Sequence, residues 1–378
     1  MQKDVYLRLL ALLRPPGDGV FTVSTHQDLK AKLHSFLYGE TSQQKVLDIW
    51  KNKISNQLKS ANLALIGASS DCGGGIQRGA NWGPLFIRMH WLLKNKSLYD
   101  NLICDLGDIP VIPHLLADKY LNEATINSCR DALYSEYSGY KNLSNLPVSP
   151  LSILEYLSDL FYKNFPDKKM VVLGGDHSIS YPLVKSLLRI NKLKGIRVAV
   201  IHFDAHTDLL DKRIGIDLNF GSWAYHILED LCDPSALVQL GIRATSKDRD
   251  QWENNLGVKQ YWAQEINKPD TDISIIANSV LTHLESLDID AIYFSVDIDV
   301  IDISQVSATG TPEQGGLDVT QVCELISRIG DKYNVLGADL VEVAPMVRCI
   351  NNMLNDNEPE STLDCAVSIL NELVGVMV

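Results

Sequence analysis

Three short segments of the chain carry most of the side chains that could perform chemistry together. They are residues 174–178 (Gly-Gly-Asp-His-Ser), 204–208 (Asp-Ala-His-Thr-Asp) and 295–299 (Ser-Val-Asp-Ile-Asp). They can supply four carboxylates and two imidazoles, namely Asp204, Asp208, Asp297, Asp299, His177 and His206. That set suffices for two adjacent divalent metal ions, and metal-activated water is the chemistry it predicts.

Each segment follows an apolar run that is typical of a buried strand. Runs rich in Val, Ile and Leu occur at 62–67, 169–174, 197–204, 236–241, 291–297 and 335–343. Stretches with helical spacing fall between them, at 178–189, 222–231, 273–287, 320–329 and 362–374. This alternation predicts an α/β fold whose parallel sheet lies between helix layers. Ligands bind at the carboxyl ends of such strands, so we expect the three segments to meet at one rim.

The spacing of these residues suits metal binding. Asp204, His206 and Asp208 alternate along a segment expected to be extended, so side chains two residues apart can converge. A ligand set rich in oxygen favours Mn²⁺, while Zn²⁺, Fe²⁺, Co²⁺ and Ni²⁺ stay open. A single Asp-x-His or Asp-x-Asp is more typical of a turn or helix cap. Four clustered carboxylates would repel one another strongly without cations, which favours the metal interpretation.

Composition restricts the class of partner and the compartment. The 378 residues carry a formal net charge of -13, which argues against a nucleic-acid or anionic-membrane surface and favours a small-molecule partner. Seven cysteines without a Cys-x-x-Cys pair fit a reducing cytosol. No membrane span or secretory signal is evident, so a cytoplasmic protein is expected. We expect residues 1–60 to form an N-terminal extension packed on a main domain at 61–378, and 109–150 to contain a helix.

The order of the motifs resembles that of the arginase, agmatinase and formimidoylglutamase (ureohydrolase) superfamily. The resemblance includes the three segments above and the later Ala-Thr-Gly-Thr-Pro at 308–312 with Gly-Gly-Leu at 315–317. Residues 78–88 resemble the family's RxGAxxGPxxIR signature, and residues 341–345 resemble its V-E-V-x-P. The match runs from about Leu63 to the C-terminus, and the first sixty residues are not covered.

The resemblance implies a three-layer α/β/α sandwich with a mainly parallel eight-stranded sheet, two Mn²⁺ ions per subunit and assembly into a trimer or hexamer. It implies hydrolysis of a C–N bond in a small linear amidine or guanidino compound, with release of urea or formamide. Asp208 would orient the nucleophile, Glu342 would bind the planar cation, and Thr311 would support the pocket. The implied ligands are His177, Asp204, Asp208 and Asp297 for one ion and Asp204, His206, Asp297 and Asp299 for the other, with Asp204 and Asp297 bridging.

The chain departs from the family pattern in one loop. Many members place a histidine before a glycine there, where it serves as proton donor, whereas this chain has Asn219-Phe220-Gly221. We expect His226 to replace that donor and Asn219 to contact substrate. Leu210 stands where arginases have a polar residue that helps to hold the carboxylate of arginine, so arginine is disfavoured. Arg213, or its neighbour Lys212, could pair with a substrate carboxylate such as that of formiminoglutamate, which agmatine lacks.

Two other functions are compatible with these residues. One is an amide deacetylase of related fold, which uses a single zinc ion. His206 and Asp299 argue against this function, because they would hold a second metal. A non-catalytic metal-binding member is suggested by Phe220 alone. Intact ligands disfavour it, since nothing but a metal would justify keeping four carboxylates together.

Overall fold

The computed structural model describes residues 3–20, 22, 24–140, 143–269, 271–347 and 357–378. An eight-stranded sheet runs through its centre in the order β2-β1-β3-β8-β7-β4-β5-β6, and each of these pairings is parallel. The strands are β1 (Leu63–Ala68), β2 (Ile103–Asp108), β3 (Lys169–Gly174), β4 (Val198–Phe203), β5 (Leu237–Ile242), β6 (Lys259–Trp262), β7 (Ala291–Asp297) and β8 (Asn334–Val341).

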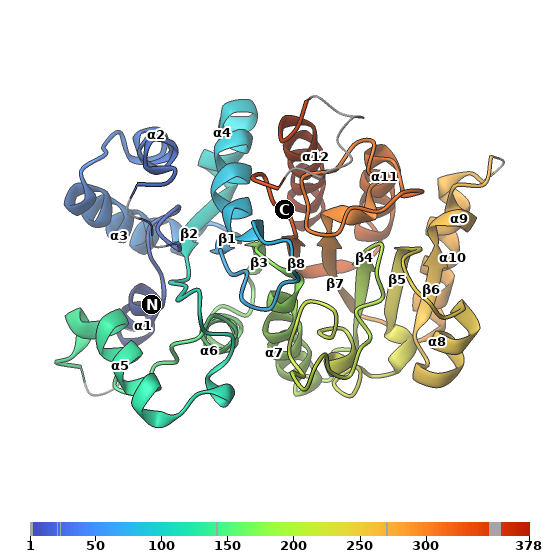
Figure 1. Cartoon of the computed structure of the whole chain (residues 1–378), viewed down its shortest axis with the longest axis horizontal. Coiled ribbons are helices and arrows are strands. Elements are labelled where there is room, and N and C mark those ends of the chain that lie inside the picture. Colours follow the sequence, from blue (N-terminus) through green and yellow to red (C-terminus); the bar gives the residue numbers. More distant parts are fainter. Residues whose placement is uncertain (1–2, 21, 23, 141–142, 270, 348–356) are drawn as a thin grey trace.

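Helices cover both faces of this sheet. In Figure 1, α4, α11 and α12 lie above it and α6 and α7 lie below it. The described helices are α1 (Lys3–Leu12), α2 (Gln27–Tyr38), α3 (Gln43–Ser60), α4 (Gly83–Leu102), α5 (Glu123–Tyr134), α6 (Pro150–Asn164), α7 (Ser180–Lys192), α8 (Arg249–Leu256), α9 (Ala263–Ile266), α10 (Ile273–Ser286), α11 (Val319–Gly330) and α12 (Glu360–Met377). The predicted three-layer α/β/α fold is therefore confirmed.

The central strands have the composition of strands that are covered on both faces. All residues of β4 (VAVIHF) and β7 (AIYFSVD) are buried, whereas a sheet with one wet face would show alternation. The register pairs Phe203 with Val296 and Asp297 with Val341. The residues that follow β4, β7 and β8 therefore emerge side by side at one edge of the sheet, as predicted.

Several elements differ from the sequence prediction, and helices such as α4 and α8 were not predicted. The strands β2 and β6 were not predicted, because their sequences ICDLGD and KQYW are short and interrupted by polar residues. The helix predicted at 222–231 is wrong, since the structure has only a 3₁₀ turn, Tyr225–Ile227, within a series of turns. The helix predicted between 109 and 150 corresponds to α5.

The first sixty residues contact the outer strand β2. Backbone groups of Arg14 and Asp108 pair in an antiparallel bridge, and Trp50 of α3 donates from Nε1 to the carbonyl oxygen of Leu106 at 3.3 Å. Figure 1 shows α1 and α3, in blue, beside β2. A boundary at residue 60 stays a prediction.

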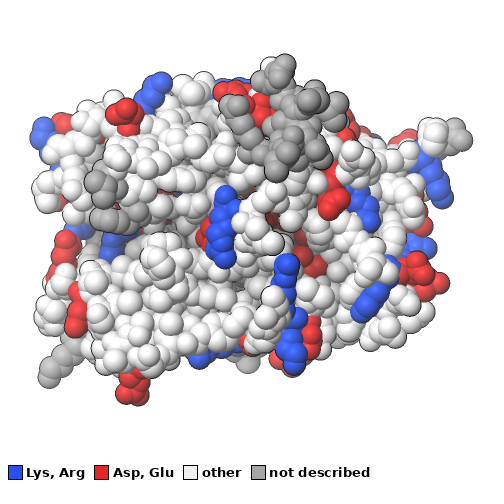
Figure 2. Space-filling view, viewed as in Figure 1, with Lys and Arg blue, Asp and Glu red and all other residues white. Residues whose placement is uncertain are grey.

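On the face shown in Figure 2, charged side chains of both signs are mixed, and the Lys and Arg side chains stand mostly apart. Among the described helices, none combines the length and apolar character needed to cross a bilayer.

Candidate metal centre

The side chain of His177 lies at the centre of three carboxylates. Its Nδ1 is 3.2 Å from Oδ2 of each of Asp204, Asp208 and Asp297. The His177 side chain is fully buried, and Nδ1 has no partner at hydrogen-bonding geometry. Three carboxylate oxygens thus converge on one imidazole nitrogen at ion-pair distance but without hydrogen-bond geometry, an arrangement that a cation would complete.

A second group adjoins the first and shares Asp204 with it. His206 Nδ1 lies 3.1 Å from Asp299 Oδ2 and 3.4 Å from Asp204 Oδ1. The two groups together contain all six predicted metal ligands. The structure brings these residues together from three strand ends, and their role as ligands stays a prediction.

Local turns aim these side chains inward. Asp297 is the last residue of β7, Asp299 lies in the 3₁₀ turn that follows, and His177 begins a 3₁₀ turn after β3. The extended conformation predicted for 204–208 is wrong, because the chain bends at residues 205–206 and Asp208 is left-handed with φ 52°. The bend follows from the Asp204 side chain, whose Oδ1 accepts the His206 backbone N–H at 2.6 Å.

Burial and mutual repulsion raise the pKa of two of these carboxyl groups, whereas the pKa of Asp204 is held well below its ordinary value, because contacts with His177, His202 and His206 outweigh its burial. Burial, followed by the charges of Asp299 and Asp204, raises the pKa of Asp297 well above its ordinary value. Burial, followed by the charge of Asp204, also raises the pKa of Asp208. Like charges so placed destabilise the fold unless a cation neutralises them. Carboxylate oxygens and imidazole nitrogens are the donors that Mn²⁺ accepts, so this site fits the predicted ion.

Glu342 is held beside this cluster in a strained conformation. It follows β8 with φ 62°, and its side chain is buried. Its Oε1 accepts the backbone N–H of His177 at 2.9 Å, and a Cβ placed on Gly310 would lie 3.7 Å from Oε2. Burial, then the charges of Asp297 and Asp176, raise its pKa well above the ordinary value. A carboxylate so desolvated gains strongly from a cationic partner.

Thr311 lies at the second group of ligands. It donates from Oγ1 to Asp299 Oδ2 at 3.0 Å. The observed contact therefore supports a predicted metal ligand directly, and contact with substrate stays a prediction.

The other predicted substrate residues, Asn219 and Arg213, and the predicted proton donor His226 lie in the 208–226 loop and have partners there. The Asn219 side chain accepts from Gly221 N–H at 3.1 Å and donates to the Ile216 carbonyl oxygen at 3.1 Å, so it shapes the loop. His226 Nε2 donates to the Asp211 carbonyl oxygen at 2.8 Å. The exposed Arg213 places its guanidinium carbon 5.4 Å from the centre of the Phe220 ring, which is a cation–π contact. The roles predicted for these three residues stay predictions.

Sequence reasoning missed several side chains that touch the predicted ligands, among them His202 and Trp223. His202 Nε2 lies 2.8 Å from Asp204 Oδ2, and Trp223 Nε1 donates to Asp208 Oδ2 at 2.9 Å. His202 could have been found, because it lies two residues before Asp204 and strand alternation puts both on one face. Trp223 reaches the site only through the fold of its loop, and no local pattern signals it.

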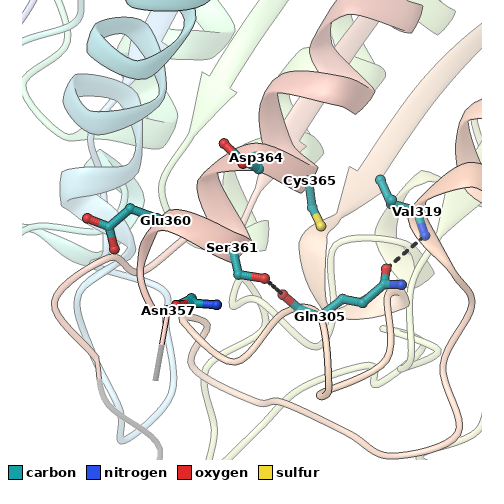
Figure 3. A pocket seen from close by; sticks show the side chains of 7 residues that line it. All are labelled: Gln305, Val319, Asn357, Glu360, Ser361, Asp364 and Cys365. Atoms are coloured by element: carbon teal, nitrogen blue, oxygen red, sulfur yellow. Dashed lines mark hydrogen bonds between the residues drawn. The ribbon is translucent and has the colours of Figure 1, made fainter. Parts of the chain in front are cut away.

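A separate cavity of about 590 Å³ lies where α12 begins (Figure 3). Three of its lining residues are joined by two hydrogen bonds: Ser361 Oγ donates to the Gln305 carbonyl oxygen at 2.7 Å, and Val319 N–H donates to Gln305 Oε1 at 3.1 Å. None of the predicted site residues lines it. It is lined by Gln305, Val319, Asn357, Glu360, Ser361, Asp364 and Cys365.

Comparison with known proteins agrees with this geometry. The family described as the Arginase family matches residues 61–375. An agmatinase of Chromobacterium violaceum is 30% identical over 323 residues, which are 82% of this chain and 85% of that protein. A mitochondrial guanidino acid hydrolase of Homo sapiens is 28% identical over 79% of this chain and 76% of its own length. Three other agmatinases are matched over only 54–61% of their length, which is 48–51% of this chain.

Solved structures share the fold. A formimidoylglutamase of Bacillus subtilis has a TM-score of 0.63 at 24% identity and covers 84% of this chain and 87% of its own. A hypothetical agmatinase of Burkholderia thailandensis has a TM-score of 0.59 at 26% identity over 84% and 86% of the two chains. The predicted enzyme class, a hydrolase of C–N bonds, is confirmed at the level of the family. The family match, the sheet topology and the motif positions agree, and the chain belongs to the arginase family.

Proposed function

We propose that the protein is a binuclear Mn²⁺ hydrolase of a small linear amidine or guanidino compound, of agmatinase or formimidoylglutamase type. The observation that carries this proposal is the convergence of three carboxylates on the unpartnered Nδ1 of His177, beside the buried carboxylate of Glu342. Family membership and the names of the similar proteins support the same chemistry.

The proposed metal ligands fall into two sets that share two carboxylates, Asp204 and Asp297. Divalent ions held there would supply water activated for attack at neutral pH and positive charge to stabilise the transition state. The sets are His177, Asp204, Asp208 and Asp297, and Asp204, His206, Asp297 and Asp299.

The chain's own residues would bind and orient the substrate. The Glu342 carboxylate is suited to receive two parallel N–H donors from a planar amidinium group. Its contact with the His177 backbone fixes its position relative to the metal ligands. Trp223 fixes the Asp208 carboxylate in the same way. Such fixed geometry contributes to rate because little reorganisation is needed during the reaction.

The proposal is tested with a substrate panel on Mn²⁺-loaded protein. Agmatine, guanidinobutyrate and formiminoglutamate are assayed with separate detection of urea, formamide and ammonia. We expect turnover of at least one substrate and its loss in Glu342→Gln, with bound metal unchanged. Stoichiometric metal without turnover of any member of an extended panel would favour the non-catalytic alternative. One bound zinc with amide hydrolysis would favour the deacetylase.

Homo-oligomeric assembly as a trimer or hexamer and a cytoplasmic location are also proposed. Both come from the family resemblance and the composition. Native mass spectrometry tests the first, and fractionation of the source cells tests the second.

A further inference from the structure

A chain of buried polar side chains crosses the sheet sideways and ends at a predicted metal ligand. It starts at the half-buried Trp262 at the end of β6, passes through Gln260 of β6 and Gln239 of β5, and reaches Asp204 through His202 of β4. The successive distances are 2.9 Å, 2.8 Å, 2.9 Å and 2.8 Å. His202, Gln239 and Gln260 are at most 1% exposed, so protein groups must satisfy them.

Two groups fix the direction of every hydrogen bond in this row of side chains: the Trp262 indole and the Thr207 carbonyl. The Trp262 indole can only donate, so the Gln260 atom it meets is the oxygen, and the Gln260 nitrogen then donates to Gln239 Oε1. Gln239 Nε2 also donates to the Thr207 carbonyl oxygen at 2.6 Å, and a carbonyl can only accept. The Gln239 atom that faces His202 Nδ1 is therefore a donor.

This direction determines the protonation of the imidazole. Because His202 Nδ1 accepts, its proton is on Nε2, which donates to Asp204 Oδ2. Both ring nitrogens are then used. His202 is thus unavailable as a metal ligand, although it lies within 4.8 Å of the ligand atoms of His177, Asp204 and Asp208.

We propose that His202, Gln239, Gln260 and Trp262 form a positioning relay that holds Asp204 for metal binding. Gln239 acts twice, since it fixes the His202 tautomer and anchors the backbone at Thr207, between His206 and Asp208. The inference rests on the proposed function only in assigning Asp204 as a ligand.

Packing alone gives no reason for such a chain. Neighbouring positions in β4 and β5 carry Val, Ile, Leu and Phe, which fill a doubly covered sheet without the cost of burying polar groups. A polar network is tolerated in such a place only when every member is satisfied. Partners that orient metal ligands typically change metal affinity about 10–100-fold when removed.

The first experiment compares Mn²⁺ affinity, measured calorimetrically on metal-free protein, between paired variants. We expect His202→Phe and Gln239→Leu to weaken Mn²⁺ binding about 10–100-fold. His202→Gln should recover most of the loss, because its side-chain amide can still donate to Asp204. Asn191→Leu is the matched control: Asn191 is buried and its amide bonds the Leu187 carbonyl oxygen within α7, away from the relay. This control should lose stability and keep its affinity.

The second experiment reads the tautomer directly. In ¹⁵N-histidine-labelled, metal-free protein, His202 should carry its proton on Nε2, and Gln239→Glu should change that state, because a carboxylate requires a donor at Nδ1. A proton on Nδ1 of His202 in the wild-type protein would overturn the proposed relay. A Mn²⁺ affinity of His202→Phe within about twofold of wild type would overturn it as well. Wild-type protein that binds no Mn²⁺ would instead overturn the proposed function. The tautomer of His202, measured without metal, would still show which way the hydrogen bonds of the relay run.

Discussion

Replacing Asp208 with Asn should make the metal-free protein more stable while it weakens metal binding. The substitution removes a charge and keeps the shape. Asn tolerates the left-handed conformation of residue 208 (φ 52°), so it adds no backbone strain. Its side-chain oxygen can still accept from Trp223 Nε1, which now lies 2.9 Å from Asp208 Oδ2. Electrostatics is therefore the main change.

The size of the gain follows from the distances. Ligand oxygens of Asp208 and Asp204 lie within 4.8 Å of each other. At an effective dielectric constant of about 20, two unit charges at that distance repel by about 3 kcal/mol. Burial of the Asp208 carboxylate adds to this cost and is the first cause of its raised pKa, and loss of the 3.2 Å contact between Asp208 Oδ2 and His177 Nδ1 offsets part of the sum. We expect the free energy of unfolding of the metal-free protein to rise by about 1–2 kcal/mol.

The assay is thermal and chemical unfolding of wild type and variant, each with chelator and with saturating Mn²⁺. Wild type should gain about 2.7 kcal/mol for each bound ion at a free Mn²⁺ concentration of about 100 times Kd, and the variant should gain clearly less. Asp118→Asn is the control, because Asp118 caps the backbone at Val148 and Ser149 outside the cluster. A variant that is less stable than wild type in chelator, with normal Mn²⁺ stabilisation, would refute the reasoning.

Three further predictions concern recognition, folding and pH. Arg213→Ala should raise KM for a guanidino acid about 10-fold and leave KM for agmatine unchanged. The reason is that the Arg213 cation, held against the Phe220 ring, would pair with a substrate carboxylate that agmatine lacks. Equal changes in the two KM values would contradict this. Arg88→Met should lower the free energy of unfolding by about 3–5 kcal/mol, because it leaves the buried Asp108 without its ion-pair partner. Adding Asp108→Asn should restore part of this loss. If chemical denaturation shows no recovery in the double variant, the ion pair is not the cause. Burial, with a neighbouring carboxylate, raises the pKa of Asp71 from 3.8 to about 6, so the folded state binds the proton first. Wild-type stability relative to Asp71→Asn should therefore rise by about 2.4 kcal/mol as pH falls from 7 to 4. Stability profiles of the two proteins that stay parallel over this range would contradict the raised pKa.

The sequence predicted the central sheet and the meeting of the six candidate ligands because both depend on local patterns. Continuous apolar runs indicate doubly covered strands, and polar residues that directly follow such runs must lie at the carboxyl edge. His177, Asp204 and Asp297 each satisfy this rule. The position of Glu342 relative to His177 needed the pairing of β3 with β8, which no local pattern specifies.

Features that depend on distant partners were missed. β2 contains Asp105 and Asp108, which argue against a buried strand until Arg88 of α4 is known to pair with both. The Gln239 side chain looks like an ordinary polar residue in β5 and gains meaning only through its neighbours on β4 and β6. At 222–231 the apolar spacing predicted a helix. Turns form at the start of that segment instead, because Asn219 Oδ1 accepts from Gly221 N–H and the Ser222 hydroxyl donates to the Asn219 carbonyl oxygen.

Hydrogen bonds from the protein hold the four clustered carboxylates in place without a metal ion. We infer that the cluster is preformed for metal binding. Each of the four aspartates accepts at least one hydrogen bond from a protein donor. The pairs are His206 N–H to Asp204, Trp223 Nε1 to Asp208, Asp299 N–H to Asp297, and Ala205 N–H with Thr311 Oγ1 to Asp299. These donors partly offset the repulsion and fix the direction in which each carboxylate points. A cluster fixed in this way would lose little conformational entropy on binding an ion. The main change on binding would then be the neutralisation of the carboxylate charges.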